Sequence, residues 1–489
     1  MKTTTLLISA FLSLLHGQLV KSCQERDYGW GSIVCVCDAN YCDYYSGLGD
    51  APTDPSTATI TISTKDGSRF ETSTIPVILS NFQEEAEFVI SFSDSDTKQI
   101  FQGLGGSFTD AAAFNYMALS DDVKYHLVSS YYNPDVGINY VLGRVPMGGA
   151  DFSWRLYTYL DTENDTELAT FSLQEEDYDY KIPMIHDAMF ATNRFYIKLI
   201  GSPWSAPAWM KTNNELYGQG KLKPEYYQIW ADYFVRFLEE YFNVYIDFWA
   251  ITGQNEPLDG LLPNFEFNCM GWTADEMRKF IAENLGPTLK NHSQFGNVKL
   301  IMMDDQRTQL ELWTRVILGD EAAAGFVDGI GLHWYLDSWF GPEILSETHD
   351  LYPEKFLIYT EACEGDIPNP AAVVLGSWER GEHYAFDIIE NLNHWVTGWV
   401  DWNLALDLEG GPNWAGNQVD SPVIVNATAN EFYKQPMFYA LGHISKFITP
   451  DSIILKNHVL QADPDNAKPV QVVVALRPDE THVAVLLNE

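Results

Sequence analysis

Eight short apolar segments recur between residues 100 and 403 of this 489-residue chain, and amphipathic stretches separate them. The segments have the length of β-strands and begin near Ile100, Ile138, Phe195, Phe248, Val298, Val327, Phe356 and Val396. Parallel strands need helical crossovers, and eight strand-helix alternations are enough to close a sheet on itself. The pattern therefore predicts an α/β protein built on a (β/α)8 TIM barrel, with a doubly wound open sheet as the structural alternative.

Two of the intervening stretches carry clear helix signals. Apolar side chains recur at helical spacing between Pro224 and Leu238, and Thr273 with Glu276 forms a Thr-x-x-Glu capping box. No Gly-x-Gly-x-x-Gly turn follows the first strand, and the chain contains no Walker loop. These absences from the sequence disfavour a nucleotide-binding function.

The two ends of the chain are rich in strand signals. Residues 58–64 alternate polar with apolar side chains, a turn-forming Asp66-Gly67 pair follows, and a further strand pattern occupies residues 87–92. Matching patterns at residues 470–476 and 482–487 flank a turn-like segment near the C-terminus. We therefore expect the two ends of the chain to share one β-sheet module.

The first residues are typical of a secretory signal. Lys2 precedes an apolar run at residues 6–15, which is too short to span a bilayer core of about 30 Å. We expect residues 1–22 to be a signal peptide and the mature protein to be lumenal or extracellular. Glycosylation sequons agree with this route, and they begin at Asn164, Asn291 and Asn426.

Four of the six cysteines lie close together just after this signal. They are Cys23, Cys35, Cys37 and Cys42. In a secreted protein such density indicates two disulfides, for which three pairings are possible, and a zinc site with four cysteine ligands is the alternative. Cys269 and Cys363 are isolated in sequence and are expected to be free thiols.

The charge balance excludes one large class of partner. The chain has 29 Lys and Arg residues against 68 Asp and Glu residues, and its formal net charge is −39 at pH 7. A surface of this sign repels the phosphate backbone, so we expect no nucleic-acid binding. Partial protonation in a compartment near pH 5 would reduce the self-repulsion and ease an approach to anionic membranes.

Polar and aromatic side chains end the predicted strands, where the active site of a barrel is built. They are Arg144, Asp151, Trp204, Asn255, Glu256, His333, Trp334, Tyr335, Glu361, Trp402 and Asn403. Glu256 and Glu361 are each a lone acid at the end of an apolar strand, and an unpaired buried carboxylate is costly. Arg144 is a candidate partner for one of them, so a purely structural ion pair is the alternative to a catalytic role.

The aromatic residues near these acids suit a sugar substrate. Core packing is the simpler explanation for any one of them, but tryptophans at strand ends can stack on sugar faces while Asn and Asp bind hydroxyls. Two carboxyls in such a setting are typical of glycosidic bond cleavage, in which one protonates the leaving oxygen and the other attacks the anomeric carbon or activates water.

The order of motifs along almost the whole mature chain resembles the glucosylceramidases of glycoside hydrolase family thirty. Gly253-Gln-Asn-Glu256-Pro and Thr360-Glu361-Ala-Cys363 resemble the acid/base and nucleophile motifs of that family. Further matches are Gly105-Gly-Ser-Phe-Thr-Asp-Ala-Ala-Ala, Arg144-Val-Pro-Met, Gly201-Ser-Pro-Trp-Ser-Ala-Pro, Met303-Asp-Asp-Gln-Arg, His333-Trp-Tyr-Leu-Asp, Asp401-Trp-Asn-Leu-Ala-Leu, Gly410-Gly-Pro-Asn-Trp and Phe432-Tyr-Lys-Gln-Pro-Met-Phe-Tyr. The mouth loop at Ser338-Trp-Phe-Gly and Gln418 depart from the family pattern.

The resemblance implies a role for each matching residue. Glu256 would be the general acid/base and Glu361 the nucleophile of a retaining mechanism, with Arg144 and His333 supporting them. Glu364 is a rival by sequence alone, but it lies past the strand end. The substrate-binding positions would be Asp151, Trp204, Asn255, Phe267, Tyr335, Trp402 and Asn417. No cofactor and no metal ion is expected.

The resemblance also implies an architecture. Residues 98–403 with 436–450 would form the catalytic barrel, and residues 23–49 with 404–435 a small disulfide-bearing antiparallel sheet. Residues 50–97 with 451–489 would form an all-β immunoglobulin-like sandwich, which we expect to be truncated at its C-terminus because the family usually continues for about 30 residues more.

The implied function is hydrolysis of glucosylceramide to glucose and ceramide in the lysosome lumen, at a membrane surface. A saposin-type activator and anionic lipid would be the partners. The alternatives are a secreted β-glucosidase or β-xylosidase that acts on soluble glycans, and a catalytically dead glycan-binding relative.

Overall fold

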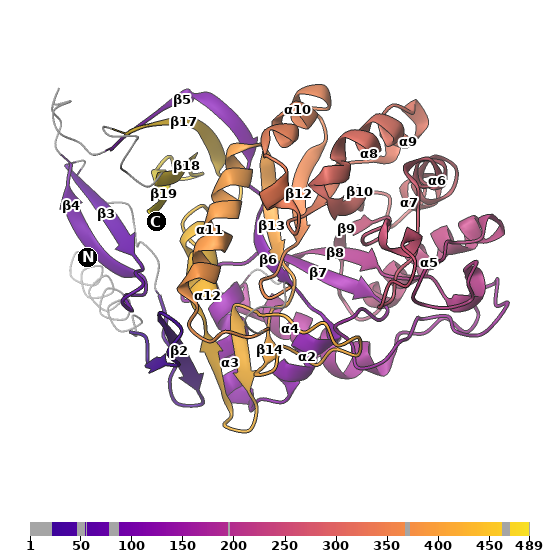
Figure 1. Ribbon diagram of the computed structural model, residues 1–489, viewed down its shortest axis with the longest axis horizontal. Helices are drawn as coiled ribbons and strands as arrows, with labels where there is room; N and C mark the ends of the chain where they lie inside the picture. Colours follow the sequence, from indigo (N-terminus) through magenta and orange to yellow (C-terminus); the bar gives the residue numbers. More distant parts are fainter. Residues whose placement is uncertain are drawn as a thin grey trace, which may run out of the picture.

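A closed barrel of eight parallel strands forms the centre of the protein, as the computed structural model shows (Figure 1). The structure describes residues 22–45, 54, 56–77, 88–193, 196–366, 372–461 and 470–488, so the predicted signal peptide lies almost wholly outside the described residues. The strand order around the barrel is β10-β11-β12-β13-β6-β7-β8-β9, in which neighbours in sequence are neighbours in space apart from the closing contacts. The predicted TIM barrel is confirmed, and the open-sheet alternative is wrong.

All eight barrel strands begin within about four residues of the predicted starts. The strands are β6 (Gly103–Ser107), β7 (Leu142–Met147), β8 (Lys198–Pro203), β9 (Phe248–Thr252), β10 (Lys299–Gln306), β11 (Gly329–His333), β12 (Phe356–Glu361) and β13 (Val396–Asp401). Ile100, the predicted start of the first barrel strand, is instead the last residue of β5 (Phe88–Ile100), which belongs to another sheet. Gly103 has a φ of +121°, a left-handed value that favours glycine, and it separates the two strands.

Helices cover the outside of the barrel (Figure 1). Their bounds are α2 (Asp110–Met117), α3 (Asp121–Tyr132), α4 (Ile182–Ala191), α5 (Tyr227–Phe242), α6 (Ala274–Phe280), α7 (Gly286–Lys290), α8 (Leu310–Ile317), α9 (Glu321–Phe326), α10 (Glu343–Leu351), α11 (Trp378–Asn393) and α12 (Pro436–Ser445). Helix α5 buries the predicted apolar face, including Trp230 and Phe234, and the Thr273–Glu276 capping box opens α6. Both helix predictions are confirmed.

The two ends of the chain meet in one sheet beside α11, as the strand patterns predicted (Figure 1). Its order is β19-β18-β17-β5, with β17 (Ile453–Gln461), β18 (Val470–Leu476) and β19 (His482–Asn488) contributed by the C-terminal segment. Every pairing in this sheet is antiparallel. A separate antiparallel hairpin joins β3 (Thr57–Ile62) to β4 (Glu71–Pro76) around the predicted turn.

A five-stranded sheet joins the N-terminus to the segment after the barrel. Its order is β1-β2-β16-β15-β14, with bounds Glu25–Asp27, Ile33–Asp38, Glu431–Lys434, Val423–Asn426 and Leu406–Asp407. Most pairings in it are antiparallel, and β14 with β15 is parallel. The sheet carries two disulfides, Cys23–Cys35 and Cys37–Cys42.

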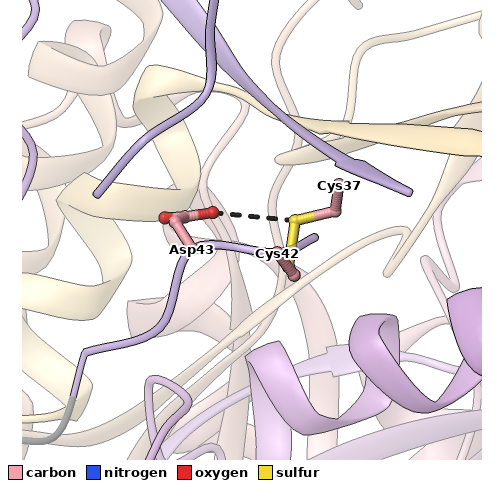
Figure 2. Close-up of side chains that lie close together, drawn as sticks. All are labelled: Cys37, Cys42 and Asp43. Carbon is pink, nitrogen blue, oxygen red and sulfur yellow. Dashed lines mark hydrogen bonds between the residues drawn. A yellow bond between two sulfur atoms is a disulfide. The ribbon is translucent and has the colours of Figure 1, made fainter. Parts of the chain in front are cut away.

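These two disulfides overturn the alternative of a four-cysteine zinc site, because bonded sulfurs are no longer thiolate ligands. Figure 2 shows Asp43 beside the Cys37–Cys42 bridge. Asp43 accepts a hydrogen bond from Tyr439 at 2.6 Å and forms an ion pair with Lys434 at 3.0 Å. Asp43 therefore ties the N-terminal sheet to α12 through Tyr439. Cys269 and Cys363 are free and buried, as expected.

None of the helices that the structure describes is both long and apolar enough to span a membrane.

Candidate active site

The predicted site residues meet at one end of the barrel. Arg144 lies on β7, His333 ends β11 and Glu361 ends β12, while the others lie just beyond a strand end or in the loops that follow. The loops that bring them together follow different strands, but parallel strands share one carboxyl edge, so the side chains converge there. The placement that the strand pattern predicted is confirmed.

Arg144 is the central cation of the site, and it is fully buried. Its Nη1 donates to Glu361 Oε2, and its Nη2 donates to Asn255 Oδ1 at 2.7 Å and to Asp304 Oδ2 at 2.8 Å. Its Nε donates to Ser202 Oγ at 3.1 Å. Since every edge of the guanidinium has an acceptor, Arg144 holds Glu361 and Asn255 in fixed positions.

The carboxyls of Glu256 and Glu361 lie close together. One oxygen of each, with Nδ1 of His333, forms a cluster whose atoms are all within 4.8 Å of one another. Retaining glycosidases keep their two carboxyls about 5–5.5 Å apart, whereas inverting enzymes leave about 6.5–9.5 Å for a water molecule. The spacing at this site fits direct attack by one of the two carboxylates.

His333 bridges two of the acids from the centre of the site. Its Nδ1 contacts Glu256 Oε1 at 2.8 Å, and its Nε2 contacts Asp304 Oδ1 at 3.2 Å. Burial disfavours its charge, but the carboxylates of Glu361, Asp304 and Glu256 outweigh burial and raise the pKa of His333 to about 10. His333 is therefore an imidazolium that donates to both acids.

Asp304 is a site residue to which the sequence analysis gave no role, although it lies in the Met303-Asp-Asp-Gln-Arg motif. It is fully buried and accepts hydrogen bonds from Thr252 and Thr360, each at 2.6 Å, besides its contacts with Arg144 and His333. These partners hold the pKa of Asp304 far below its usual range, against the effect of burial. An acid inside an apolar strand was the signal that could have identified it.

A bulge in β10 aims Asp304 at the site. The pairing of β10 with β11 shifts register between Met303 and Asp305, and Met303 and Asp304 have φ values of 72° and 59°. A bulge of this kind redirects a side chain that regular alternation would point elsewhere. The strand pattern alone could not reveal it.

Glu256 sits on an unusual backbone, with a φ of 39°. Its N–H donates to Asp304 O at 2.9 Å, and its Oε1 also accepts from Gln306 Nε2 at 3.0 Å. Burial opposes ionisation, but the hydrogen bond and charge of His333, with Asp259 and Arg144, lower the pKa of Glu256. Burial raises the pKa of Glu361, against the opposing charges of His333 and Arg144.

The wall opposite these acids carries the predicted sugar-binding groups. Asn417 Nδ2 donates to Asp151 Oδ2 at 2.8 Å, which brings a distant loop to the end of β7. The rings of Trp204 and Trp402 stack at 5.0 Å and 13°, and the Arg144 guanidinium lies over both. Burial and the facing charge of Glu361 raise the pKa of Asp151 to about 7.

Tyr335 and Phe267 pack against this tryptophan pair at the edge of the site. The hydroxyl of Tyr335 donates to Glu361 Oε1 at 2.9 Å. Tyr335 also lines a groove of about 1060 Å³, whose lining includes Trp339 and Trp30. Trp339 is 77% exposed, so a large apolar side chain faces solvent at the mouth of the site.

Glu364 lies outside the cluster. Its carboxylate faces His383 Nδ1 at 2.8 Å and Arg380 Nε at 3.8 Å.

The sequon residues Asn164 and Asn291 are exposed, while Asn426 is half-buried and its Nδ2 donates to Tyr433 at 2.9 Å.

Comparison with known proteins identifies the family. Residues 101–448 match the glycosyl hydrolase family 30 TIM-barrel domain. The chain belongs to glycosyl hydrolase family 30. It is 44% identical to the lysosomal acid glucosylceramidase of Mus musculus, over 95% of this chain and 89% of the mouse protein. It is 41% identical to putative glucosylceramidase 4 of Caenorhabditis elegans, over 95% of this chain and 88% of the nematode protein.

Two solved structures share the architecture of the chain. SrfJ from Salmonella typhimurium superposes with a TM-score of 0.78 at 26% identity, covering 88% of this chain and 96% of SrfJ. The endo-β1,6-glucanase BT3312 superposes with a TM-score of 0.75 at 25% identity, covering 89% of this chain and 93% of the glucanase. The chain is thus a glycoside hydrolase with a family 30 barrel.

Proposed function

We propose that this glycoside hydrolase is a retaining β-glucosidase that hydrolyses glucosylceramide to glucose and ceramide. The observation that carries the proposal is the close pair of carboxyls, Glu256 just after β9 and Glu361 at the end of β12, in a family 30 barrel. The choice of substrate is supported by the similarity to the mouse lysosomal acid glucosylceramidase along nearly the whole chain.

In the first step Glu361 is the nucleophile. Its Oε2 accepts from Arg144 and its Oε1 from Tyr335, so the carboxylate is held in one orientation. The bond between the anomeric carbon and the leaving oxygen breaks as Glu361 bonds to that carbon, and Glu256 gives a proton to the leaving oxygen.

In the second step Glu256 acts as a base. Glycosylation removes the negative charge of Glu361, which makes ionisation of Glu256 easier. Glu256 takes a proton from water while the water oxygen attacks the anomeric carbon and releases Glu361. His333 donates to Glu256 and stabilises its ionised form at this stage.

The opposite wall would bind the glucose. Asp151 and Asn417 provide acceptors and a donor for hydroxyl groups, and Asn255, which Arg144 orients, would bind the hydroxyl next to the anomeric carbon. Trp204 and Trp402 supply an apolar face against which a sugar ring can pack.

The groove beyond Tyr335 would take the aglycone. Exposed Trp339 and Phe340 at the mouth suit a lipid chain, and we expect the protein to work peripherally on membranes with anionic lipid and a saposin-type activator. We place it in the lysosome lumen, reached by the secretory pathway, with glycans on Asn164, Asn291 and Asn426.

A second candidate keeps the chemistry and changes the substrate to a soluble β-glucoside or β-xyloside. The similarity to endo-1,6-β-glucanases, which act on glucans, favours keeping this candidate. The third candidate is a binding protein without activity, and the close placement of the Glu256 and Glu361 carboxyls argues against it. Turnover of glucosylceramide vesicles beside a water-soluble glucoside separates the first two.

The test of the proposed function uses the purified wild type with Glu361→Gln, and with Glu364→Gln as the matched control. An activated 2-fluoroglucoside at pH 5 should label wild type and Glu364→Gln on Glu361, as mass spectrometry would show. Glu361→Gln should be unlabelled and should lose at least about 1000-fold of the hydrolysis of a fluorogenic β-glucoside. Folded wild-type protein that shows neither labelling nor turnover would contradict the proposal.

A further inference from the structure

A second carboxyl, that of Asp259, lies against Glu256. Asp259 begins a short 3-10 turn, Asp259–Leu261, and its N–H donates to Glu256 O at 3.0 Å. The two side chains share a hydrogen bond, and both residues are half-buried. Two carboxyl groups can share a hydrogen bond only when one of them carries a proton.

The turn that carries Asp259 is fastened on three sides. Leu258 N–H reaches Asp305 Oδ2 at 3.4 Å, Trp272 N–H donates to Pro257 O at 2.9 Å, and Gly220 N–H donates to Gly260 O at 2.9 Å. Gly260 packs so closely against Gly271 that a Cβ added to Gly260 would lie 2.0 Å from the backbone nitrogen of Gly271. Because this backbone has no room to move, the contact between the two carboxyls is a fixed property of the fold.

The first step of the reaction needs a proton that Glu256 alone holds poorly. His333 is an imidazolium that donates to Glu256, and Arg144 is also near, so the cations favour the ionised form of Glu256. Burial, the charge of Glu256 and the shared hydrogen bond raise the pKa of Asp259 to about 12. The hydrogen bond between the two carboxyls therefore keeps one proton on the pair.

We propose that Asp259 is a positioning and proton-holding residue for the acid/base, so that Glu256 and Asp259 act as a carboxyl pair that delivers one proton to the leaving oxygen. This inference rests on the proposed function and deepens it. In the first step the one proton of the pair passes through Glu256 to the leaving oxygen, which leaves both carboxyls ionised. In the second step the proton lost by water returns to the pair, so the cycle balances.

The groups that face the pair come from every neighbouring strand. Besides His333 and Arg144, they are Asp304 and Asp305 on β10, Glu361 on β12, and the thiol of Cys269. Burial and the charge of Glu256 raise the pKa of Asp305 to about 7, and burial raises the pKa of Cys269 to about 11, so both are neutral at pH 5. The pair therefore titrates chiefly against the charges of Glu361, Asp304 and the two cations.

The test compares Asp259→Asn with wild type on two β-glucosides. One has an alkyl leaving group, which needs protonation, and the other has a dinitrophenyl leaving group, which does not. Asn keeps the size of Asp and donates an N–H to Glu256, but it supplies no proton. We expect kcat/KM for the alkyl glucoside to fall at least tenfold, an effect within the range of general acid catalysis of about 10²–10⁴. The value for the dinitrophenyl glucoside should stay within about twofold of wild type.

The pH dependence of kcat/KM is a second measurement, which would not change if Asp259 had a merely structural role. Without Asp259 the proton on Glu256 should be lost at lower pH, so the basic limb of kcat/KM for the alkyl glucoside should move to the acid side by at least about one unit. Asp259→Ala is the second variant and should behave alike. Asp275→Asn, on the exposed face of α6, is the control.

The inference would be overturned if folded Asp259→Asn depended on the leaving group as wild type does and its basic limb of kcat/KM did not move. The same would follow if both leaving groups lost activity equally, since that would indicate a general disturbance of the site. Labelling of Glu361 by the 2-fluoroglucoside in all variants keeps this outcome distinct from failure of the proposed function, in which wild type itself is neither labelled nor active.

Discussion

At the scale of single residues, the site is a buried network in which each charge has an opposite partner. Arg144 and His333 face three acids, Asp304, Glu256 and Glu361. Removing one member of a buried ion pair leaves its partner uncompensated, which typically costs about 3–5 kcal/mol. Loss of any one member should therefore destabilise the fold, while the intact network orients the reacting groups.

Asp304 gives the clearest prediction at this scale. Asp304→Asn removes the charge that Arg144 and His333 share, so both cations should turn further toward the catalytic carboxyls and misplace them. We expect kcat for a β-glucoside to fall about 100-fold, as small misplacements of reacting groups do, while KM changes little because Asp304 does not face the sugar wall. Steady-state kinetics with a thermal melt would measure both effects.

The matched control for Asp304 is Asp328→Asn. Asp328 forms ion pairs with Lys290 and Lys299 just before β11 begins, at the opposite end of the barrel. Its loss should lower stability slightly and leave kcat within about twofold. Equal effects of the two substitutions on kcat would contradict the special role of Asp304.

At the scale of elements, two features of the strands decide the site. The bulge in β10 points Asp304 inward, and the close approach of β6 to β7 completes the barrel. Gly105 on β6 allows that approach, because a Cβ added there would meet Leu142 O at 2.1 Å. A backbone atom cannot move aside as a flexible side chain can.

Gly105→Ala should therefore strain the closure of the barrel. We expect a loss of unfolding free energy of at least about 1–3 kcal/mol, as for other overpacked interiors, with a lower Tm and less soluble protein. Gly325→Ala is the control, because nothing lies within 4 Å of its added Cβ in α9. Denaturant unfolding of the two variants beside wild type would measure the difference. A Gly105→Ala protein as stable as wild type would show that β6 and β7 can separate.

At the scale of the whole molecule, buried acids couple stability to pH. The pKa is raised to about 7 at Asp151, Asp305 and Asp387, in each case mainly by burial. An acid whose pKa is higher in the folded state binds more protons there than in the unfolded chain. Stability from these groups is therefore present at low pH and declines as pH rises from about 4 to about 7.

The protein should thus be more stable near pH 5 than near pH 7.5. We expect Tm to fall by several degrees between these values, and Asp387→Asn, which removes one of the three acids at a distance from the reacting groups, to flatten the dependence. Differential scanning calorimetry at matched ionic strength would test this. A Tm that rises toward pH 7.5 in both proteins would contradict it.

The sequence by itself determined the barrel, the strand ends and the identity of the two catalytic candidates. Strand and helix periods depend on neighbours along the chain, and parallel strands bring their carboxyl ends together whatever their exact lengths. For that reason Arg144, Glu256 and Glu361 could be selected before the fold was known, and the resemblance to family 30 assigned their expected roles.

Only the tertiary structure decided which side chains touch. The role of Asp304 depends on a bulge, and the contact of Asp151 with Asn417 joins loops 266 residues apart in sequence. The same holds for the pairing of the four cysteines and for the carboxyl contact between Glu256 and Asp259. Both depend on distances between side chains, which the periodicity of the sequence does not give. The physical reason is that hydrogen bonds and shared protons act over about 3 Å, a scale that packing alone sets.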